Sequence, residues 1–148
     1  MIGIIVTGHG NFGTGLASSV KLIAGEPEKF IPVDFVEGMS SEDLEAKYRN
    51  AFEQLKDCEG GILVFTDLIG GSPFKISAEL SVTLADTYHI AILSGTNLGM
   101  LIEASMSRQF AEDADALADS IVNTGKDQVI HYVYQAKDEV EEEPSEGI

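Results

Sequence analysis

The chain contains little cysteine and no long apolar run. Cys58 is the one cysteine among 148 residues, which excludes an internal disulfide and favours a reducing compartment, so we expect a cytosolic protein. No apolar stretch approaches the roughly 18 residues that a membrane-spanning helix needs, and direct insertion into a membrane is therefore not expected. The apolar start at residues 1–6 has no basic residues before it, which is typical of a first strand and not of a signal peptide.

Basic residues are also scarce. Nine Lys and Arg face 25 Asp and Glu, giving a formal net charge of −16. A nucleic-acid partner is not expected, because phosphate backbones require basic surfaces. The acidic surface favours solubility, and the alternative is that it steers a basic partner protein. Residues 136–148 are acidic and poor in apolar side chains, which predicts one domain over residues 1–135 followed by a flexible tail.

Apolar runs alternate with amphipathic segments along the domain. Strands are predicted over residues 2–7, 30–35, 61–66, 88–93 and 129–134. Helices are predicted between them: one that ends at Gly25, one capped by Ser40 or Ser41, one with Ser72 as its N-cap and Pro73 first, one over 97–108 with Met100 and Met106 in the core, and one whose apolar face covers 114–122. The alternation predicts an α/β, flavodoxin-like, doubly wound fold with a mostly parallel sheet of order 2-1-3-4.

A histidine and an aspartate follow the ends of two predicted strands. His9 follows the first strand, and Asp67 follows the third. In this fold a ligand binds beyond the carboxyl ends of the strands where their order reverses, so His9 and Asp67 are predicted to flank one crevice. A carboxylate that accepts the Nδ1 proton of His9 would leave Nε2 free as a nucleophile and stabilise the cationic ring once Nε2 is phosphorylated.

Glycines and predicted helix starts surround this pair. Gly10, Gly70 and Gly71 would let the main chain approach an anion without a Cβ in the way, and Ser72 adds a hydroxyl. Two helices, after Phe12 and at Ser72, are predicted to direct their N-termini at the same place. We therefore predict that the four residues bind the phosphoryl group.

Other interpretations remain open from the residues alone. His9 could be a solvated loop residue and Asp67 a turn former. Gly8-His9-Gly10 with Gly13, and Asp34 about 20 residues further on, resemble part of a dinucleotide fingerprint, although His9 would occupy the tight turn. No Gly-Lys-Ser/Thr indicates a nucleotide P-loop, and the three scattered histidines predict no metal site, so no cofactor is expected.

Three motifs resemble a known family. They are Thr7–Gly10 followed by Asn11–Leu16, the longer run Asp67-Leu68-Ile69-Gly70-Gly71-Ser72-Pro73-Phe74, and the weaker match Gly95–Leu101. The chain is thereby similar to the IIA components of the mannose class of bacterial sugar phosphotransferase systems, from Ile2 to about Tyr134. Lys75 stands where Asn is frequent in the family, and Gly99 where many members have Pro.

The resemblance implies a phosphocarrier. The general phosphocarrier protein HPr would phosphorylate His9 at Nε2, with Asp67 as the carboxylate partner, and His9 would pass the phosphate to a IIB component during sugar uptake through the IIC/IID membrane permease. It implies a cytoplasmic protein, held at the membrane only through the permease complex, and a homodimer whose terminal strand, here 129–134, crosses to the neighbouring subunit. A regulatory module of the same fold and the phosphocarrier of a dihydroxyacetone kinase system are the alternatives, and the sugar stays open.

Overall fold

The computed structural model describes residues 1–136 and has a parallel sheet at its centre. Strands β1 (Gly3–His9), β2 (Phe30–Phe35), β3 (Ile62–Thr66) and β4 (Ile90–Leu93) are ordered β2-β1-β3-β4, and all neighbouring pairs are parallel. The helices are α1 (Phe12–Ala24), α2 (Ser41–Gln54), α3 (Ser72–Thr83), α4 (Leu98–Ser107), the 3-10 helix η1 (Arg108–Phe110) and α5 (Ala114–Asp127). The predicted flavodoxin-like sheet is confirmed.

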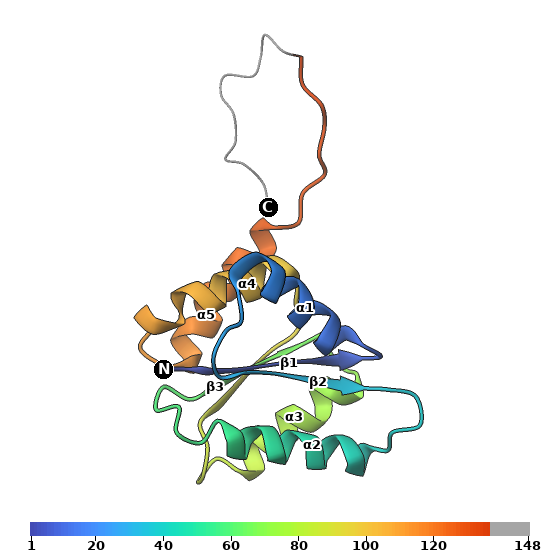
Figure 1. Cartoon of the computed structure of the whole chain (residues 1–148), viewed down its shortest axis with the longest axis vertical. Coiled ribbons are helices and arrows are strands. Elements are labelled where there is room, and N and C mark those ends of the chain that lie inside the picture. The colour runs from blue at the N-terminus through green and yellow to red at the C-terminus, as the bar shows by residue number, and fades with distance from the viewer. Residues whose placement is uncertain (137–148) are drawn as a thin grey trace.

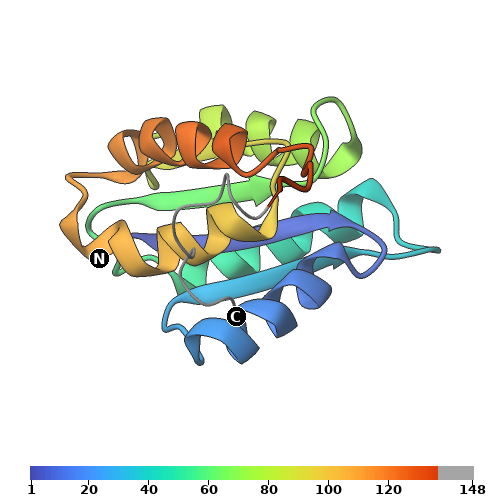
Figure 2. The same cartoon turned by 90° about the horizontal axis from the view of Figure 1, so that it is seen from above.

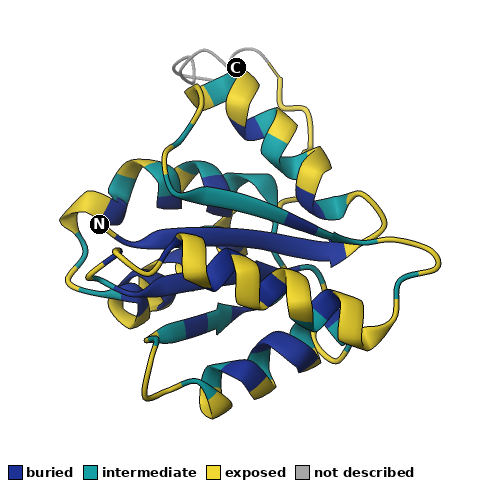
Figure 3. Ribbon diagram, turned by 60° about the horizontal axis from the view of Figure 1, so that its bottom comes forward, coloured by how far each residue is buried: buried dark blue, intermediate teal, exposed yellow. Residues whose placement is uncertain are grey.

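Helices cover both faces of the sheet. Helices α1, α4 and α5 lie side by side over one face, and α2 and α3 cover the other (Figures 1 and 2). Ile4 and Val6 of β1 pack with the first layer, whereas Ile5 packs with the second. A parallel strand between two helix layers is apolar on both sides, and β1 is buried along its length until His9, which is exposed (Figure 3).

Most helix boundaries agree with the sequence signals. Ser40 caps α2, and its hydroxyl accepts from the Asp43 N–H at 3.0 Å while the Asp43 carboxylate accepts from the Ser40 N–H. Gly25 ends α1 as predicted. Helix α3 differs by one residue, because its N-cap is Gly71, which is extended at φ −80° and ψ 172°, and Ser72 is already helical. None of the described helices combines the length and the apolar character needed to cross a membrane.

One core prediction in α4 is half wrong. Met100 is buried, but Met106 is 60% exposed. The buried face of α4 also contains Ala104, and two further residues turn a helix by about 200°, so Met106 points away from the core.

The last predicted strand does not form within this chain. Residues 129–134 have no strand conformation, and their large apolar side chains are exposed. The two edge strands of the sheet differ as possible partners for this segment. The outer edge of β2 carries Pro32, which has no N–H to donate, whereas β4 has no proline. The strand exchange between subunits stays a prediction. The predicted acidic tail, apart from Ala136, lies outside the described residues and remains a prediction.

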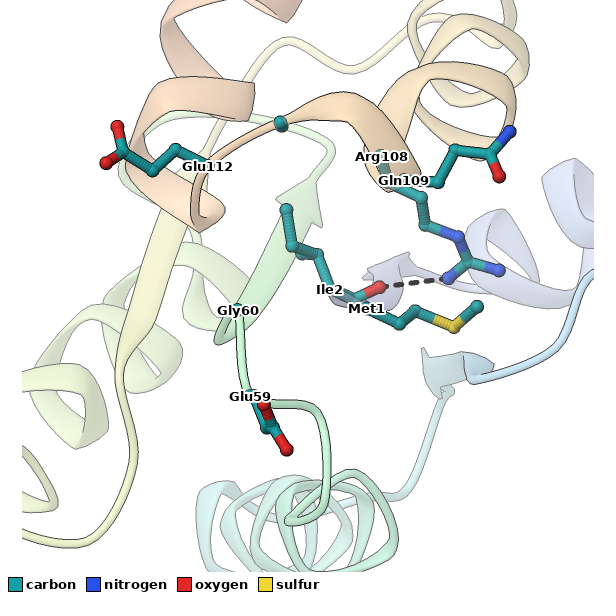
Figure 4. A pocket seen from close by; sticks show the side chains of 8 residues that line it. Met1, Ile2, Glu59, Gly60, Arg108, Gln109 and Glu112 are labelled. Atoms are coloured by element: carbon teal, nitrogen blue, oxygen red, sulfur yellow. Dashed lines mark hydrogen bonds between the residues drawn. The ribbon is translucent and has the colours of Figure 1, made fainter.

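A buried arginine binds main-chain carbonyls at the amino ends of β1 and β2. Arg108 is 5% exposed and donates to the Ile2 carbonyl at 3.0 Å (Figure 4). It also donates to the carbonyls of Lys29, at 3.3 Å, and Glu28. A cavity of about 440 Å³ lies beside it. Because Ile2 precedes β1 and His9 ends it, this cavity is at the opposite edge of the sheet from the predicted site.

Candidate functional site

His9 and Asp67 meet at the carboxyl edge of the sheet. The last pair of β1 with β3 sets Thr7 opposite Thr66, so the residues that follow Thr7 and Thr66 leave the sheet side by side. The Nδ1 atom of His9 lies 2.7 Å from Oδ2 of Asp67, and the main-chain N–H of His9 donates to the same oxygen at 2.9 Å. The strand order of the sheet thus brings the two side chains together as the sequence predicts.

The partner of Nδ1 fixes the proton on the ring. The carboxylate of Asp67 can only accept, so in the neutral ring Nδ1 is assigned the hydrogen and Nε2 has the free lone pair. Burial raises the pKa of Asp67, but hydrogen bonds from the main chain of His9, the His9 ring and the Leu68 N–H outweigh it and hold the pKa below its ordinary value of 3.8. Asp67 is therefore ionised at neutral pH, in the form that this tautomer requires.

The ring is open to solvent while its carboxylate is covered. The side chain of His9 is 46% exposed, against 9% for Asp67. The Phe35 ring lies at the edge of the imidazole, with 5.9 Å between ring centres and an angle of 67°. Sequence reasoning missed Phe35, because nothing but the pairing of β1 with β2, which sets His9 opposite Phe35, places it there. A nucleophile of this kind can be reached by another protein and needs no deep pocket.

Two glycines beside the pair have specific roles. A Cβ on Gly8 would lie 2.8 Å from Cγ of Asp67, so the absence of a side chain lets the carboxylate approach His9. Gly10 has φ +62° and donates its N–H to the Phe35 carbonyl at 2.8 Å. That N–H is therefore already engaged, and Gly10 contributes a left-handed turn after His9, not a free donor.

The N-terminus of α3 lies against Nε2. A Cβ on Gly71 would be 2.7 Å from Cε1 of His9 and 3.3 Å from Nε2. Among residues 1–136, no acceptor is bound by the N–H groups of Gly70, Gly71 or Ser72. Free N–H groups at a helix start attract anions, so α3 offers an anion site directly beside the free nitrogen.

Helix α1 presents a different N-terminus. The carboxylate of Asp34 accepts from the Thr14 N–H at 2.9 Å and from its hydroxyl at 2.6 Å. This carboxylate at the start of α1 weakens its attraction for an anion, which the sequence did not predict. It also removes support for a nucleotide site, because Asp34 is engaged within the fold and not free to bind a ribose.

One group of possible metal ligands lies elsewhere in the described part of the chain. Single ligand atoms of His89, Asp113 and Asp115 are within 4.8 Å of one another. His89 pairs with Asp115 at 2.8 Å, and Asp113 caps α5 by accepting from the Ala116 N–H. These contacts explain the group without an ion, and the positive end of the α5 dipole opposes a cation there.

Comparisons with known proteins point to one family. The family model EIIA-man, described as "PTS system fructose IIA component", matches residues 3–122. The mannose-specific EIIAB component of the phosphotransferase system (PTS) of Escherichia coli K12 is 33% identical over 128 residues, which are 86% of this chain and 38% of the relative. The chain thus spans well under half the length of that relative.

Two further relatives have lengths close to this chain. The PTS fructose-specific EIIA component of Bacillus subtilis is 31% identical over 117 residues, which cover 79% of this chain and 77% of the relative. The crystal structure of a phosphotransferase system component EIIA from Streptococcus agalactiae superposes with a TM-score of 0.81 at 41% identity, covering 88% of this chain and 97% of that one. Sequence and fold therefore agree on the similarity.

Proposed function

Because the chain belongs to the EIIA-man family of phosphotransferase-system IIA components, we propose that His9 carries a phosphoryl group between two proteins during sugar uptake. The observation that carries this proposal is the 2.7 Å contact between Nδ1 of His9 and Asp67, which leaves Nε2 as the nucleophilic nitrogen beside the N-terminus of α3. A solvent-exposed imidazole fits a role in phosphoryl transfer better than a role in nucleotide binding.

Phosphoryl transfer between two histidines needs no reactant beyond the two proteins. The Nε2 lone pair of His9 attacks the phosphorus of a phosphohistidine on the donor, a new P–N bond forms, and the old P–N bond breaks with its electron pair returning to the donor ring. The His9 ring then has bonds on both nitrogens and a positive charge, which the carboxylate of Asp67 stabilises. Donation to the next protein is the same step in reverse.

The N-terminus of α3 would hold the phosphoryl oxygens. The main-chain N–H groups of Gly70, Gly71 and Ser72, with the Ser72 hydroxyl, form the proposed phosphate-binding set. Gly10 was also expected in this set. We propose instead that it forms the left-handed turn directly after His9.

The partners follow from the family. We propose HPr as donor and a IIB component as acceptor, and the printed name of the E. coli relative, EIIAB, supports a IIB acceptor. Through IIB the chain would serve the IIC/IID permease, and a cytoplasmic location is part of the same proposal. The net charge of −16 suits a donor with a basic docking face.

A homodimer is proposed from the exposed segment after α5. Val129, Ile130, Tyr132, Val133 and Tyr134 are 63–78% exposed, and a run of exposed apolar side chains of this kind marks an interaction surface. The outer edge of β4 is a free sheet edge within the described residues. Pairing of 129–134 with β4 of a second copy would bury both.

The test is labelling with the complete donor chain. Incubated with phosphoenolpyruvate, enzyme I and HPr, the protein should gain acid-labile, base-stable phosphate, and His9→Ala should abolish it. His89→Ala is the matched control and should label fully. Labelling that persists in His9→Ala would contradict the assignment.

A further inference from the structure

A chain of buried hydroxyl groups lies beneath His9. The Tyr48 hydroxyl on α2 is 2.8 Å from the Thr7 hydroxyl on β1 and 3.1 Å from the Pro73 carbonyl on α3. Thr7 and Tyr48 are fully buried, at 0% exposure each. One side chain thus joins the central strand to the helix whose N-terminus borders the site.

The donors in this chain can be assigned. A carbonyl only accepts, so the single hydrogen of the Tyr48 hydroxyl goes to Pro73, and the Thr7 hydroxyl must donate to the oxygen of Tyr48. Burial raises the pKa of Tyr48 well above its ordinary value, which keeps that hydrogen in place at every working pH. Ser77 also donates to the Pro73 carbonyl, at 2.7 Å, so this end of the link is held from two sides.

The link Thr7–Tyr48–Pro73 begins and ends two residues away from His9 and Gly71. Thr7 precedes His9 by two positions on β1, and Pro73 follows Gly71 by two positions on α3. Gly71 is the residue that lies against Nε2 of His9. A shift of the first turn of α3 relative to β1 would therefore change the distance between the nucleophile and the N–H groups proposed to hold the phosphoryl group.

The hydroxyl is not needed to fill space. The Tyr48 ring stacks on Phe52, with 6.4 Å between ring centres and an angle of 25°, among apolar side chains of the α2 and α3 layer. A phenylalanine would fill the same space, but it would leave the buried Thr7 hydroxyl without the acceptor that Tyr48 provides. The polar atom therefore points to a task other than packing.

We infer that Tyr48 is a positioning residue for phosphoryl transfer, which sets the N-terminus of α3 against Nε2 of His9 through the link Thr7–Tyr48–Pro73. This inference rests on the proposed function and assigns it a residue outside the exposed site. Rates of well-oriented reactions are sensitive to displacements of about 1 Å, so loss of the link should slow transfer without preventing it.

The experiment compares two Tyr→Phe variants of the full chain. Tyr48→Phe removes the link, whereas Tyr88→Phe removes a hydroxyl that donates to Glu53 at 2.9 Å on the surface. Phosphoramidate serves as donor, because a small molecule separates the chemistry of the site from protein docking. We expect the maximal first-order rate constant for phosphorylation of His9 to fall about tenfold in Tyr48→Phe with the half-saturating phosphoramidate concentration unchanged, since orientation and not binding is lost, and Tyr88→Phe to match the unaltered protein.

Two further measurements separate positioning from stability. Ile121→Val trims the core of the other helix layer, and it should lower the free energy of unfolding without slowing transfer. The His9 Hε1 resonance should shift in Tyr48→Phe and not in Tyr88→Phe, because Cε1 is the His9 atom nearest the position that a Cβ of Gly71 would occupy. If Tyr48→Phe does not fold, Thr7→Val breaks the other end of the link and should give the same two results.

The outcomes are distinct. Full labelling of Tyr48→Phe on His9 at the end point, reached more slowly, supports both the function and the link. A wild-type rate together with an unshifted Hε1 resonance would overturn the role of Tyr48. Absence of label on His9 in the unaltered protein would overturn the function alone, and the Hε1 comparison would still decide whether Tyr48 positions α3.

Discussion

Gly71 touches the nucleophilic edge of His9. A Cβ at Gly71 would lie 3.3 Å from Nε2 and 2.7 Å from Cε1, closer than carbon atoms pack. The main chain of Gly71 is extended, at φ −80° and ψ 172°, which every L-residue adopts. The Cβ of an alanine at this position would clash with the His9 ring, whereas its backbone would be unstrained. The substitution therefore tests the contact between α3 and His9 alone.

The first prediction concerns this contact. Gly71→Ala should push the ring or the helix start away and lower the rate of His9 phosphorylation by about 100-fold, the cost of a displacement near 1 Å at a reacting centre. The measurement is the single-turnover rate with phosphorylated HPr. Gly15→Ala is the control, since a Cβ on Gly15 meets nothing within 4 Å, and it should leave the rate unchanged. Equal rates for both variants would show that the α3 contact is not needed.

The second prediction concerns the carboxylate. Asp67→Asn keeps the shape but loses the charge that stabilises a cationic ring, so the phosphorylation rate should fall about 10²–10⁴-fold while the fold is retained. Asp115→Asn changes a second His–Asp pair, His89 with Asp115 at 2.8 Å, and should have no effect on the rate. Circular dichroism of both variants checks the fold. A normal rate in Asp67→Asn would remove the carboxylate from the mechanism.

The third prediction is a pH dependence of stability. The pKa of Asp67 lies below its ordinary 3.8 in the folded protein, so its contribution is complete above about pH 4 and is lost as the pH falls through the folded pKa. Other carboxylates with lowered pKa values, Asp43 and Asp57 among them, are present in every variant and cancel in a difference. The unfolding free energy of the unaltered protein minus that of Asp67→Asn should therefore shrink as the pH falls from about 4 towards the folded pKa of Asp67. A difference that does not change with pH would contradict this.

The sheet and the His9–Asp67 pair could be predicted from the sequence because each depends on local patterns. Continuous apolar runs mark β1 and β3, and alternation with helices leaves few possible strand orders. Once the order is fixed, the carboxyl ends of neighbouring strands must be adjacent, and residues that follow them must meet.

The missed features depend on contacts that no spacing encodes. The N–H of Gly10 is bound by Phe35, and the Asp34 carboxylate by Thr14, because β2 happens to lie beside β1 in this register. Tyr48 belongs to an apolar stripe on α2 and looks like an ordinary core residue until its hydroxyl is seen between two other elements. The segment 129–134 differs for another reason: a strand needs a partner edge, and within the described residues 129–134 pairs with no edge of its own chain, so its pairing with a second copy stays a prediction.

The fourth prediction concerns the exposed segment. The unaltered protein should have about twice the chain mass of 15.9 kDa by light scattering. Ile130→Asp with Tyr132→Asp places charges on one face of the segment and should give a monomer. Leu22→Asp changes a residue that is 88% exposed on α1 and should stay dimeric. A monomeric unaltered protein would refute the proposed exchange.

The most direct test asks which nitrogen carries the phosphate. The protein, labelled with ¹⁵N-histidine and phosphorylated by HPr, is examined by NMR for coupling between phosphorus and a ring nitrogen. Because Asp67 holds the hydrogen on Nδ1, the account predicts coupling to Nε2 of His9 alone. Coupling to Nδ1, or to a ring nitrogen of His89 or His131, would contradict it.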